Sequence, residues 1–266
     1  MLFSEDQLQR YSRHMILAEV GVEGQEKLLE ARVLVVGAGG LGSPVGYYLA
    51  AAGVGDLAIV DNDVVELSNL QRQIAHSTKK IGMPKVASAK NTFEALNPDT
   101  KVTAIRDRIT RDNIFRLIGS YDIVVDCSDN FATRFLLNDA CVLSKKLLVS
   151  GAILKFEGQL TTILPGEGHC YRCLFEEMPP TDIIVSLQTA GLVGAIPGVI
   201  GALQALEVIK LIVGMEGVLK ERLLIFDGLK TKFRRIKVHR NIACPVCGEH
   251  PTITTLDDRD YGAAKS

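Results

Sequence analysis

VLVVGAGGLGSPVGYYLAAAGVGDLAIVDND, residues 33–63, contains the pattern from which the fold follows. The apolar run VLVV meets Gly37, Gly39 and Gly42 in the spacing G-x-G-x-x-G, and the small residues that follow, with a proline near their start, favour a helix. The run DLAIVD then predicts a second buried strand that ends at Asp61. Strand, glycine turn, helix and strand together make a βαβ unit of about 30 residues.

The rest of the chain continues this alternation. Strands are predicted in KVTAIRD, YDIVVDCSD and KLLVSGAI, and helical segments over 5–30, 85–96, 111–117 and 133–144. Such alternation predicts an α/β protein with a Rossmann-like, doubly wound and mostly parallel sheet. After Ser150, FEGQLTTILPG and RLLIFDGLKTKFRRIKVHR look like strands joined by turns, so we expect antiparallel strands to continue the sheet.

No linker divides the chain into independent parts. We expect a helical segment over 1–30, a single domain over 31–248 and a C-terminal tail over 249–266, whose end, TTLDDRDYGAAKS, is expected to be flexible. The apolar stretch 191–214 includes Glu207 and Lys210, and its uninterrupted part is shorter than the roughly 18 residues of a membrane span. A buried helix is therefore expected there, and no membrane partner.

The composition excludes some classes of partner. The 266 residues carry a formal net charge of −1, which gives no overall field for a polyanion, so nucleic acid is not expected as a partner. The first residues, MLFSEDQLQRYSRH, lack the apolar core of a signal peptide. We therefore expect a cytoplasmic protein.

The three glycines predict a phosphate-binding loop. Glycine brings backbone N–H groups close to phosphate oxygens, and the N-terminus of the following helix adds a partial positive charge. Asp61, at the end of the second strand, is placed to accept hydrogen bonds from ribose hydroxyls. The combination favours a bound nucleotide over a merely structural turn, but it does not distinguish NAD from ATP.

Residues farther along the chain bear on that choice. A triphosphate carries more negative charge than a dinucleotide and requires side-chain cations and a metal as well as the helix end. SNLQRQ, residues 68–73, and Lys85 supply candidates, although Arg72 is equally acceptable as a solvated side chain. Asp129 and Asn130 end the stretch DIVVDCSDN at the same edge of the sheet, where a carboxylate can hold Mg²⁺.

Four of the six cysteines form two C-x-x-C pairs, Cys170 with Cys173 and Cys244 with Cys247. Two such turns converge naturally on one tetrahedral Zn²⁺, and disulfides are much less expected in a cytoplasmic chain. We predict a closed, structural Zn(Cys)₄ site. Cys127 and Cys141 lie in apolar runs and are expected to be core residues.

Seven motifs occur in the order found in one family of enzymes: RYSRHMIL, GAGGLGSP, DNDVVELSNLQRQ, GMPKV, DCSDN, CYRCLF and CPVCG. On these motifs the chain, from Leu8 to about Gly248, resembles MoeB, ThiF and HesA, bacterial relatives of the ubiquitin-activating enzymes. The resemblance implies that the domain over 31–248 is an adenylating domain. Its reaction would be ATP-dependent adenylylation of the C-terminal glycine of a ubiquitin-like sulfur carrier, of the ThiS or MoaD kind, for thiamine or molybdopterin biosynthesis.

The resemblance also implies roles for individual residues. Those expected at the nucleotide are Gly37, Gly39, Gly40, Gly42, Asp61, Asn69, Arg72, Lys85, Asp129 and Asn130. Asn69, Arg72 and Lys85 would surround the phosphates, and Asp129 would bind Mg²⁺. Arg13, in the segment 1–30, would reach the phosphates of the neighbouring subunit, which makes a homodimer part of the active site. The expected catalytic residues are Arg72, Lys85, Asp129 and Arg13.

The chain departs from the family pattern in the loop PPTDIIVSLQTAG, where many relatives have a cysteine and this sequence has Leu187. Leucine cannot form a thioester or a disulfide-linked intermediate, so a covalent sulfur relay through this position is not expected. The simplest interpretation is that another protein brings sulfur to the acyl-adenylate.

Two other functions remain open. One is an NAD-dependent oxidoreductase, for which no substrate domain is evident, and the other is a non-catalytic, zinc-stabilised module that binds a carrier. The basic stretch KTKFRRIKVHR, residues 230–240, is best interpreted as a solvated strand face. Contact with an acidic carrier protein is a second interpretation of the same stretch.

Overall fold

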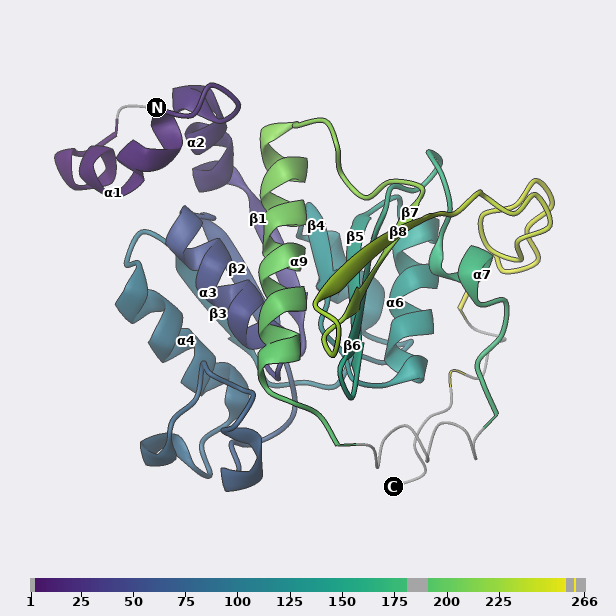
Figure 1. Ribbon diagram of the computed structural model, residues 1–266, viewed down its shortest axis with the longest axis horizontal. Helices are drawn as coiled ribbons and strands as arrows, with labels where there is room; N and C mark the ends of the chain where they lie inside the picture. The colour runs from purple at the N-terminus through teal and green to yellow at the C-terminus, as the bar shows by residue number, and fades with distance from the viewer. Residues whose placement is uncertain (1–2, 181–190, 257–260, 262–266) are drawn as a thin grey trace.

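One sheet runs through the protein. Figure 1 shows the computed structural model, which describes residues 3–180, 191–256 and 261. Its eight strands lie in the order β3-β2-β1-β4-β5-β6-β7-β8. They are β1 (Arg32–Val36), β2 (Asp56–Val60), β3 (Lys101–Ile105), β4 (Ile123–Asp126), β5 (Leu147–Leu154), β6 (Glu157–Ile163), β7 (Arg222–Asp227) and β8 (Lys232–Lys237).

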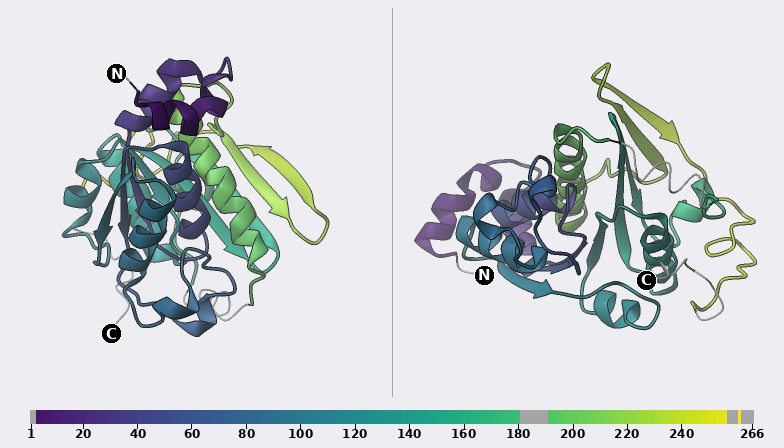
Figure 2. Two further views of the ribbon diagram at one scale, coloured as in Figure 1. Left: turned by 90° about the vertical axis from the view of Figure 1, so that its left-hand side faces the viewer. Right: turned by 90° about the horizontal axis from the view of Figure 1, so that it is seen from below.

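The helices form two layers over this sheet. The α-helices are α1 (Glu5–Met15), α2 (Gly21–Glu30), α3 (Gly42–Ala52), α4 (Lys85–Leu96), α5 (Ile114–Gly119), α6 (Phe131–Leu143), α7 (Tyr171–Leu174) and α9 (Ala195–Val213). Two short 3-10 turns, η1 (Leu67–Asn69) and η2 (Thr78–Lys80), precede α4. Helices α3, α4 and α9 pack on one face, and α5 and α6 pack on the other (Figures 1 and 2).

Alternation along the central strand supplies both cores. Val33 and Val35 of β1 enter the cluster under α3 and α9, while Leu34 and Val36 enter the cluster under α5 and α6. Successive side chains of a strand point to opposite faces, and a strand covered on both faces is therefore apolar throughout. The predicted Rossmann-like sheet is confirmed, as is its antiparallel continuation, because β1 to β5 pair in parallel and β5 to β8 pair antiparallel.

The order of the strands reverses beside β1, which lies between β2 and β4. Val36 pairs with Val60 on one side and with Asp126 on the other, so three strands end at one edge. In doubly wound sheets this reversal opens a crevice beyond the carboxyl ends of the strands. The turn from β1 into α3 is tight: Gly37 has a φ of +99°, and a Cβ on Gly42 would lie 1.9 Å from the Gly37 carbonyl oxygen.

The apolar stretch 191–214 forms a helix of the core. Helix α9 is long and apolar enough to cross a membrane by length and composition, but half of that window is buried inside the protein. It packs along β5, β6 and α3, and the buried Glu207 accepts hydrogen bonds from Thr162 and from the Leu219 N–H. The predicted buried helix is confirmed.

Part of the C-terminal tail packs against the protein, including two residues of the stretch 254–266 that is expected to be flexible. Ile253, Leu256 and Tyr261 are buried in the core cluster that contains α6, and the Tyr261 hydroxyl donates to the Asp139 carboxylate at 2.8 Å. The expectation of a flexible end is therefore wrong for Leu256 and Tyr261, which bury apolar surface that a free tail would leave in water. Composition alone did not reveal them, because three apolar residues are scattered among polar ones.

We expect Tyr261→Ala to lower the free energy of unfolding by about 3 kcal/mol, because a buried ring and a hydrogen bond are lost together. Urea unfolding measures the change. Leu229→Ala, at the exposed turn between β7 and β8, is the control and should change it by less than about 0.5 kcal/mol. Equal effects of the two substitutions would show that residue 261 is not part of the packed core.

Candidate functional site

The glycine loop lies at the carboxyl edge of the sheet and is braced by Asp61. The Gly37 N–H donates to the Val60 carbonyl at 2.9 Å, and the Ala38 N–H donates to the Asp61 carboxylate at 2.8 Å. The second oxygen of Asp61 accepts from the Asp63 N–H, also at 2.8 Å. Asp61, the predicted acceptor for ribose hydroxyls, therefore lies against the glycine loop.

The loop leaves backbone donors free beside the N-terminus of α3. Within the described part of the chain, the N–H groups of Gly39 and Gly40 donate to no protein acceptor, while the Gly39 carbonyl accepts from the Ser43 N–H at 3.0 Å. Free N–H groups at the start of a helix bind anions, because the helix dipole places positive charge there. These two groups can accept a phosphate.

Asn69 and Lys85 line one hollow of about 320 Å³ near this edge. The Lys85 ammonium lies 2.8 Å from the Asp63 carboxylate, and the side chain of Lys85 is only 7% exposed, whereas that of Asp63 is 58% exposed. Asn69 is held by the turn before it, where its Oδ1 accepts from the Glu66 N–H at 3.3 Å. The structure therefore brings these two predicted phosphate residues together and adds a carboxylate beside the lysine.

Arg72 lies next to the glycine loop. A Cβ on Gly40 would lie 3.7 Å from Arg72 Cγ and 3.3 Å from the ring of Pro197 in the first turn of α9. Arg72 Nη1 donates to the Ser68 carbonyl at 3.0 Å, and the side chain is half-buried. Of the two interpretations, the position beside Gly40 favours a phosphate contact over a solvated side chain.

Asp129 is an exposed carboxylate at the end of β4. Within the described residues it takes part in no ion pair, and it accepts a 3.4 Å hydrogen bond from the Asn130 amide. Asn130 is the N-cap of α6, accepting from the Thr133 N–H at 2.8 Å. The preceding Cys127 carbonyl lies 2.7 Å from where a Cβ on Gly37 would be, so β4 ends against the glycine loop. A free carboxylate there fits a hard cation such as Mg²⁺.

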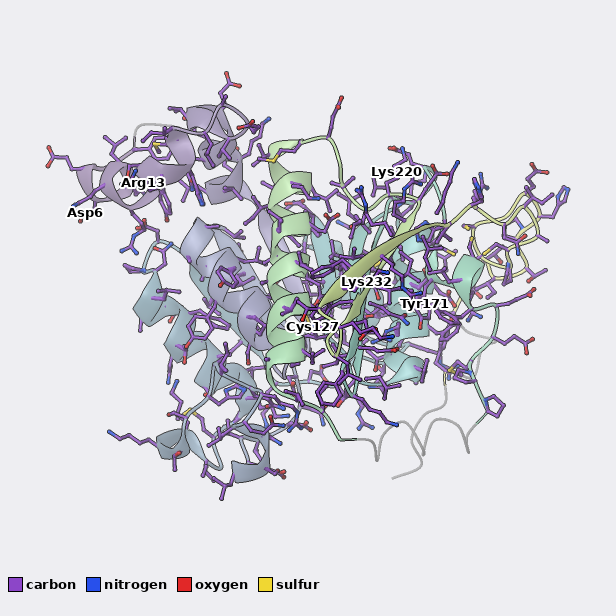
Figure 3. All side chains as sticks on the ribbon, in the orientation of Figure 1. Asp6, Arg13, Cys127, Tyr171, Lys220 and Lys232 are labelled. Carbon is purple, nitrogen blue, oxygen red and sulfur yellow. The ribbon has the colours of Figure 1, made fainter. Side chains whose placement is uncertain are left out.

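Arg13 is not brought to this edge within one chain. It is exposed on α1, and Figure 3 shows it far from Cys127, the neighbour of the glycine loop. Leu187 lies outside the described residues. The structure therefore collects all the predicted nucleotide residues except Arg13.

Sequence reasoning missed two residues beside the loop, Asp63 and His76. Both ring nitrogens of His76 are hydrogen-bonded, and burial lowers its pKa below the ordinary value of 6.5. A carboxylate two residues beyond Asp61, and a single histidine shortly after SNLQRQ, were the available signals. Neither residue type alone indicates a particular contact.

The four cysteines of the two C-x-x-C pairs come together at one point, as predicted. Their sulfur atoms all lie within 4.8 Å of one another. The separations are 3.6 Å for Cys170 and Cys244, 3.4 Å for Cys173 and Cys247, and 4.0 Å for Cys170 and Cys173. Tetrahedral zinc with Zn–S bonds of about 2.3 Å separates its ligands by about 3.8 Å, so the cluster could hold this ion.

Side chains of α6 support this thiol cluster. Asp139 accepts three hydrogen bonds from the Arg172 guanidinium, at 2.8–3.0 Å, and Asn138 accepts from the Tyr171 N–H at 2.7 Å. Four thiols leave no open coordination position, so the cluster fits a structural rather than a catalytic ion. Cys127 and Cys141 lie elsewhere and are buried, as predicted, and burial raises the pKa of both thiols.

A doubly wound sheet whose glycine loop offers free N–H groups places the chain among the nucleotide-binding α/β proteins. A sequence model of the ThiF family matches residues 11–246, and the chain belongs to this family.

Relatives with named activities share most of the chain. It is 51% identical, over 96% of its length, to "Adenylyltransferase and sulfurtransferase MOCS3" of Culex quinquefasciatus, of which it spans 58%. It is 48% identical to "Sulfur carrier protein adenylyltransferase" of Thermus thermophilus, with 97% of both chains covered. The structure of E. coli MccB with ATP is similar, with a TM-score of 0.81 and 26% identity over 90% of this chain and 73% of that one.

We expect the purified protein to contain about one zinc ion per chain, measured by elemental analysis. Cys244→Ser should lose most of the metal and lower the Tm by about 10 °C, because binding energy of the metal is folding energy. Cys141→Ala changes a buried cysteine outside the cluster and should keep the zinc. Full zinc content in the Cys244→Ser protein would contradict the assignment.

Proposed function

We propose that this protein adenylylates the C-terminal glycine of a ubiquitin-like sulfur carrier with ATP, releasing pyrophosphate. The observation that carries the proposal is the loop with free N–H groups at Gly39 and Gly40, beside Arg72, Lys85 and Asp129. An NAD-dependent oxidoreductase would leave those charged residues without a role. The name of the Thermus thermophilus relative and the ATP complex of MccB support the same reaction.

Each residue would contact a different part of the nucleotide. Asp61 would accept the ribose hydroxyls, and Gly37, Gly39, Gly40 and Gly42 form the loop against the phosphates. Asn69, Arg72 and Lys85 would bind the phosphate chain, and Asn130 would lie beside the nucleotide. Lys85 would exchange its contact with Asp63 for a phosphate oxygen, a short movement within the hollow that both residues line.

The reaction needs positioning and positive charge more than a general base. A C-terminal carboxylate is ionised at neutral pH, so its oxygen can attack the α-phosphorus directly. One P–O bond forms to the carboxylate while the bond to the β-phosphate breaks and pyrophosphate leaves. Arg72 and Lys85 would stabilise the charge on the leaving group. Asp129 would hold Mg²⁺, which supplies further charge neutralisation at the phosphates.

The carrier would reach this edge from the β7–β8 hairpin, which ends the sheet and projects from the body of the protein (Figure 2). Every side chain of β8 is exposed, and Lys232, Arg234, Arg235 and Lys237 are basic. Such a strand complements an acidic carrier and would speed its encounter with the enzyme. The zinc ion would fix the chain that follows β8 to α7 and so hold the base of this hairpin.

The active form would be a homodimer. Leu8 on α1 and Ile16, just after this helix, are exposed apolar side chains. Together with an apolar groove that contains Tyr48 and Ile74, they offer surface for a second copy. In such a dimer Arg13 of one protomer would reach the phosphates bound by its partner. The chain would work in the reducing cytoplasm, where free thiols persist, and a separate protein would supply sulfur.

Arg72→Ala and Asp129→Ala should each lower the rate of carrier-dependent ATP–pyrophosphate exchange by at least about 100-fold. The first variant loses a cation at the phosphates, and the second loses the carboxylate that would hold Mg²⁺, so the negative charge of the transition state is less well stabilised. Exchange with ThiS-type and MoaD-type carriers, measured side by side, also identifies the pathway. Arg32→Ala and Asp122→Ala are matched controls: they remove an exposed pair at the opposite edge of the sheet and should leave exchange nearly unchanged. Normal exchange in the Arg72 or Asp129 variant would refute the proposed site.

The contribution of Arg13 can be tested by mixing subunits. Arg13→Ala and Arg72→Ala proteins should each be inactive, yet refolding them together should restore about a quarter of the wild-type rate. Half of the dimers are then mixed, and each mixed dimer has one site with both arginines intact. If Arg13 acts within its own chain, every mixed dimer lacks a complete site and no activity returns.

A further inference from the structure

His76 links the glycine loop to α4. One ring nitrogen, Nε2, lies 2.8 Å from the Ala38 carbonyl oxygen, and the other, Nδ1, lies 2.8 Å from the Ser88 hydroxyl oxygen. His76 and Ser88 are both buried. The two contacts therefore connect residues far apart in the sequence inside the protein.

The Ala38 carbonyl fixes one proton of the ring. A carbonyl oxygen only accepts, so Nε2 must carry a proton and donate it to Ala38. In the neutral imidazole Nδ1 is then the acceptor, and the Ser88 hydroxyl donates to it. A neutral ring in this tautomer satisfies both of its nitrogens and also gives the Ser88 hydroxyl proton an acceptor.

The charges around the ring favour the same neutral state. Lys80 on η2 and Lys85 on α4 both oppose a positive charge on the ring, and Asp61 is the acidic group that favours one. The Lys80 ammonium is fixed nearby by the Ser88 carbonyl at 2.9 Å and by Thr92 at 2.7 Å. Burial is the largest cause of the lowered pKa of His76.

His76 and Asp61 together clamp the residue at the centre of the turn. Asp61 accepts from the Ala38 N–H, while His76 donates to the Ala38 carbonyl. With both sides of Ala38 occupied, the next two N–H groups, those of Gly39 and Gly40, are left without protein acceptors in the described residues. A loop held in this form before binding loses less conformational entropy when a phosphate arrives.

We propose that His76, oriented by Ser88, is a positioning residue that fixes the Ala38 carbonyl and holds the glycine loop ready for the phosphates. The role rests on the proposed function, because it presumes that ATP occupies this loop. His76 does not touch the nucleotide. It acts through one backbone carbonyl, which no substitution at position 38 removes.

Two substitutions at this position separate positioning from folding. His76→Leu removes the donor and should raise both the Kd for ATP–Mg²⁺, measured by calorimetry, and the KM for ATP about tenfold, with a smaller change in kcat. His76→Gln keeps an N–H donor that can reach Ala38 and should restore affinity to within about threefold of wild type. Ser88→Ala leaves the donor in place but frees the ring, so an intermediate loss is expected.

The outcomes also separate this inference from the proposed function. Wild-type protein that binds no ATP would overturn both. Wild-type protein that binds ATP, with equal affinity in His76→Leu, would overturn the role of His76 alone. If His76→Leu fails to fold, the other two variants still decide the question. An affinity for ATP in His76→Gln about tenfold or more below that of wild type overturns the proposal. An affinity in His76→Gln within about threefold of wild type, with a larger loss in Ser88→Ala, supports it.

Discussion

The buried ion pair between Asp126 and Arg134 joins the parts of the protein that meet at the carboxyl edge of the sheet. Asp126 ends β4, and Arg134 lies one turn into α6. The distance from Arg134 Nε to Asp126 Oδ2 is 3.1 Å. Asp126 also accepts from the Ser128 N–H and from the hydroxyls of Ser128 and Ser150, and Arg134 donates to the carbonyl oxygens of Ser128 and Gly151. Removing one member of such a buried pair costs about 3–5 kcal/mol, because the other charge is left without compensation. The ion pair and its hydrogen bonds therefore hold both ends of the loop 127–130, while Asp129 within this loop is exposed to solvent.

Helix α6 extends this constraint to the thiol cluster. Its N-terminus is capped by Asn130 at the carboxyl edge of the sheet, and its later turns hold Tyr171 and Arg172 through Asn138 and Asp139. The guanidinium of Arg134 also lies 5.8 Å from the centre of the Tyr171 ring. A metal at the cysteines would order this segment and, through one rigid helix, the loop that carries Asp129. A structural ion would therefore influence the carboxyl edge of the sheet without contacting it.

Local sequence patterns were sufficient for the sheet and for most of the candidate site. The residues around Gly37, Asp61 and Asp129 lie at strand ends, so a correct set of strands also predicts that they share an edge. The partner of Lys85 could not be predicted in this way, because it depends on how the segment after Asp61 folds back against α4. The packing of Tyr261 depends in turn on Asp139, a residue more than a hundred positions away. Contacts of this kind follow from tertiary structure and leave no periodic trace in the sequence.

Two cations of the candidate site already have protein partners, Lys85 with the Asp63 carboxylate and Arg72 with the Ser68 carbonyl. A nearly buried ammonium without a counter-charge would be costly, and the two positive groups would repel each other across the same edge. Under the proposed function, a phosphate chain would have to replace Asp63 in order to engage Lys85, which would lower affinity for any anion that offers only one charge. A ligand that carries several charges and binds the free N–H groups at the same time could offset that loss. The resting pairs would then favour a triphosphate over smaller anions, and this selectivity would come from Asp63, a carboxylate that the sequence motif did not single out.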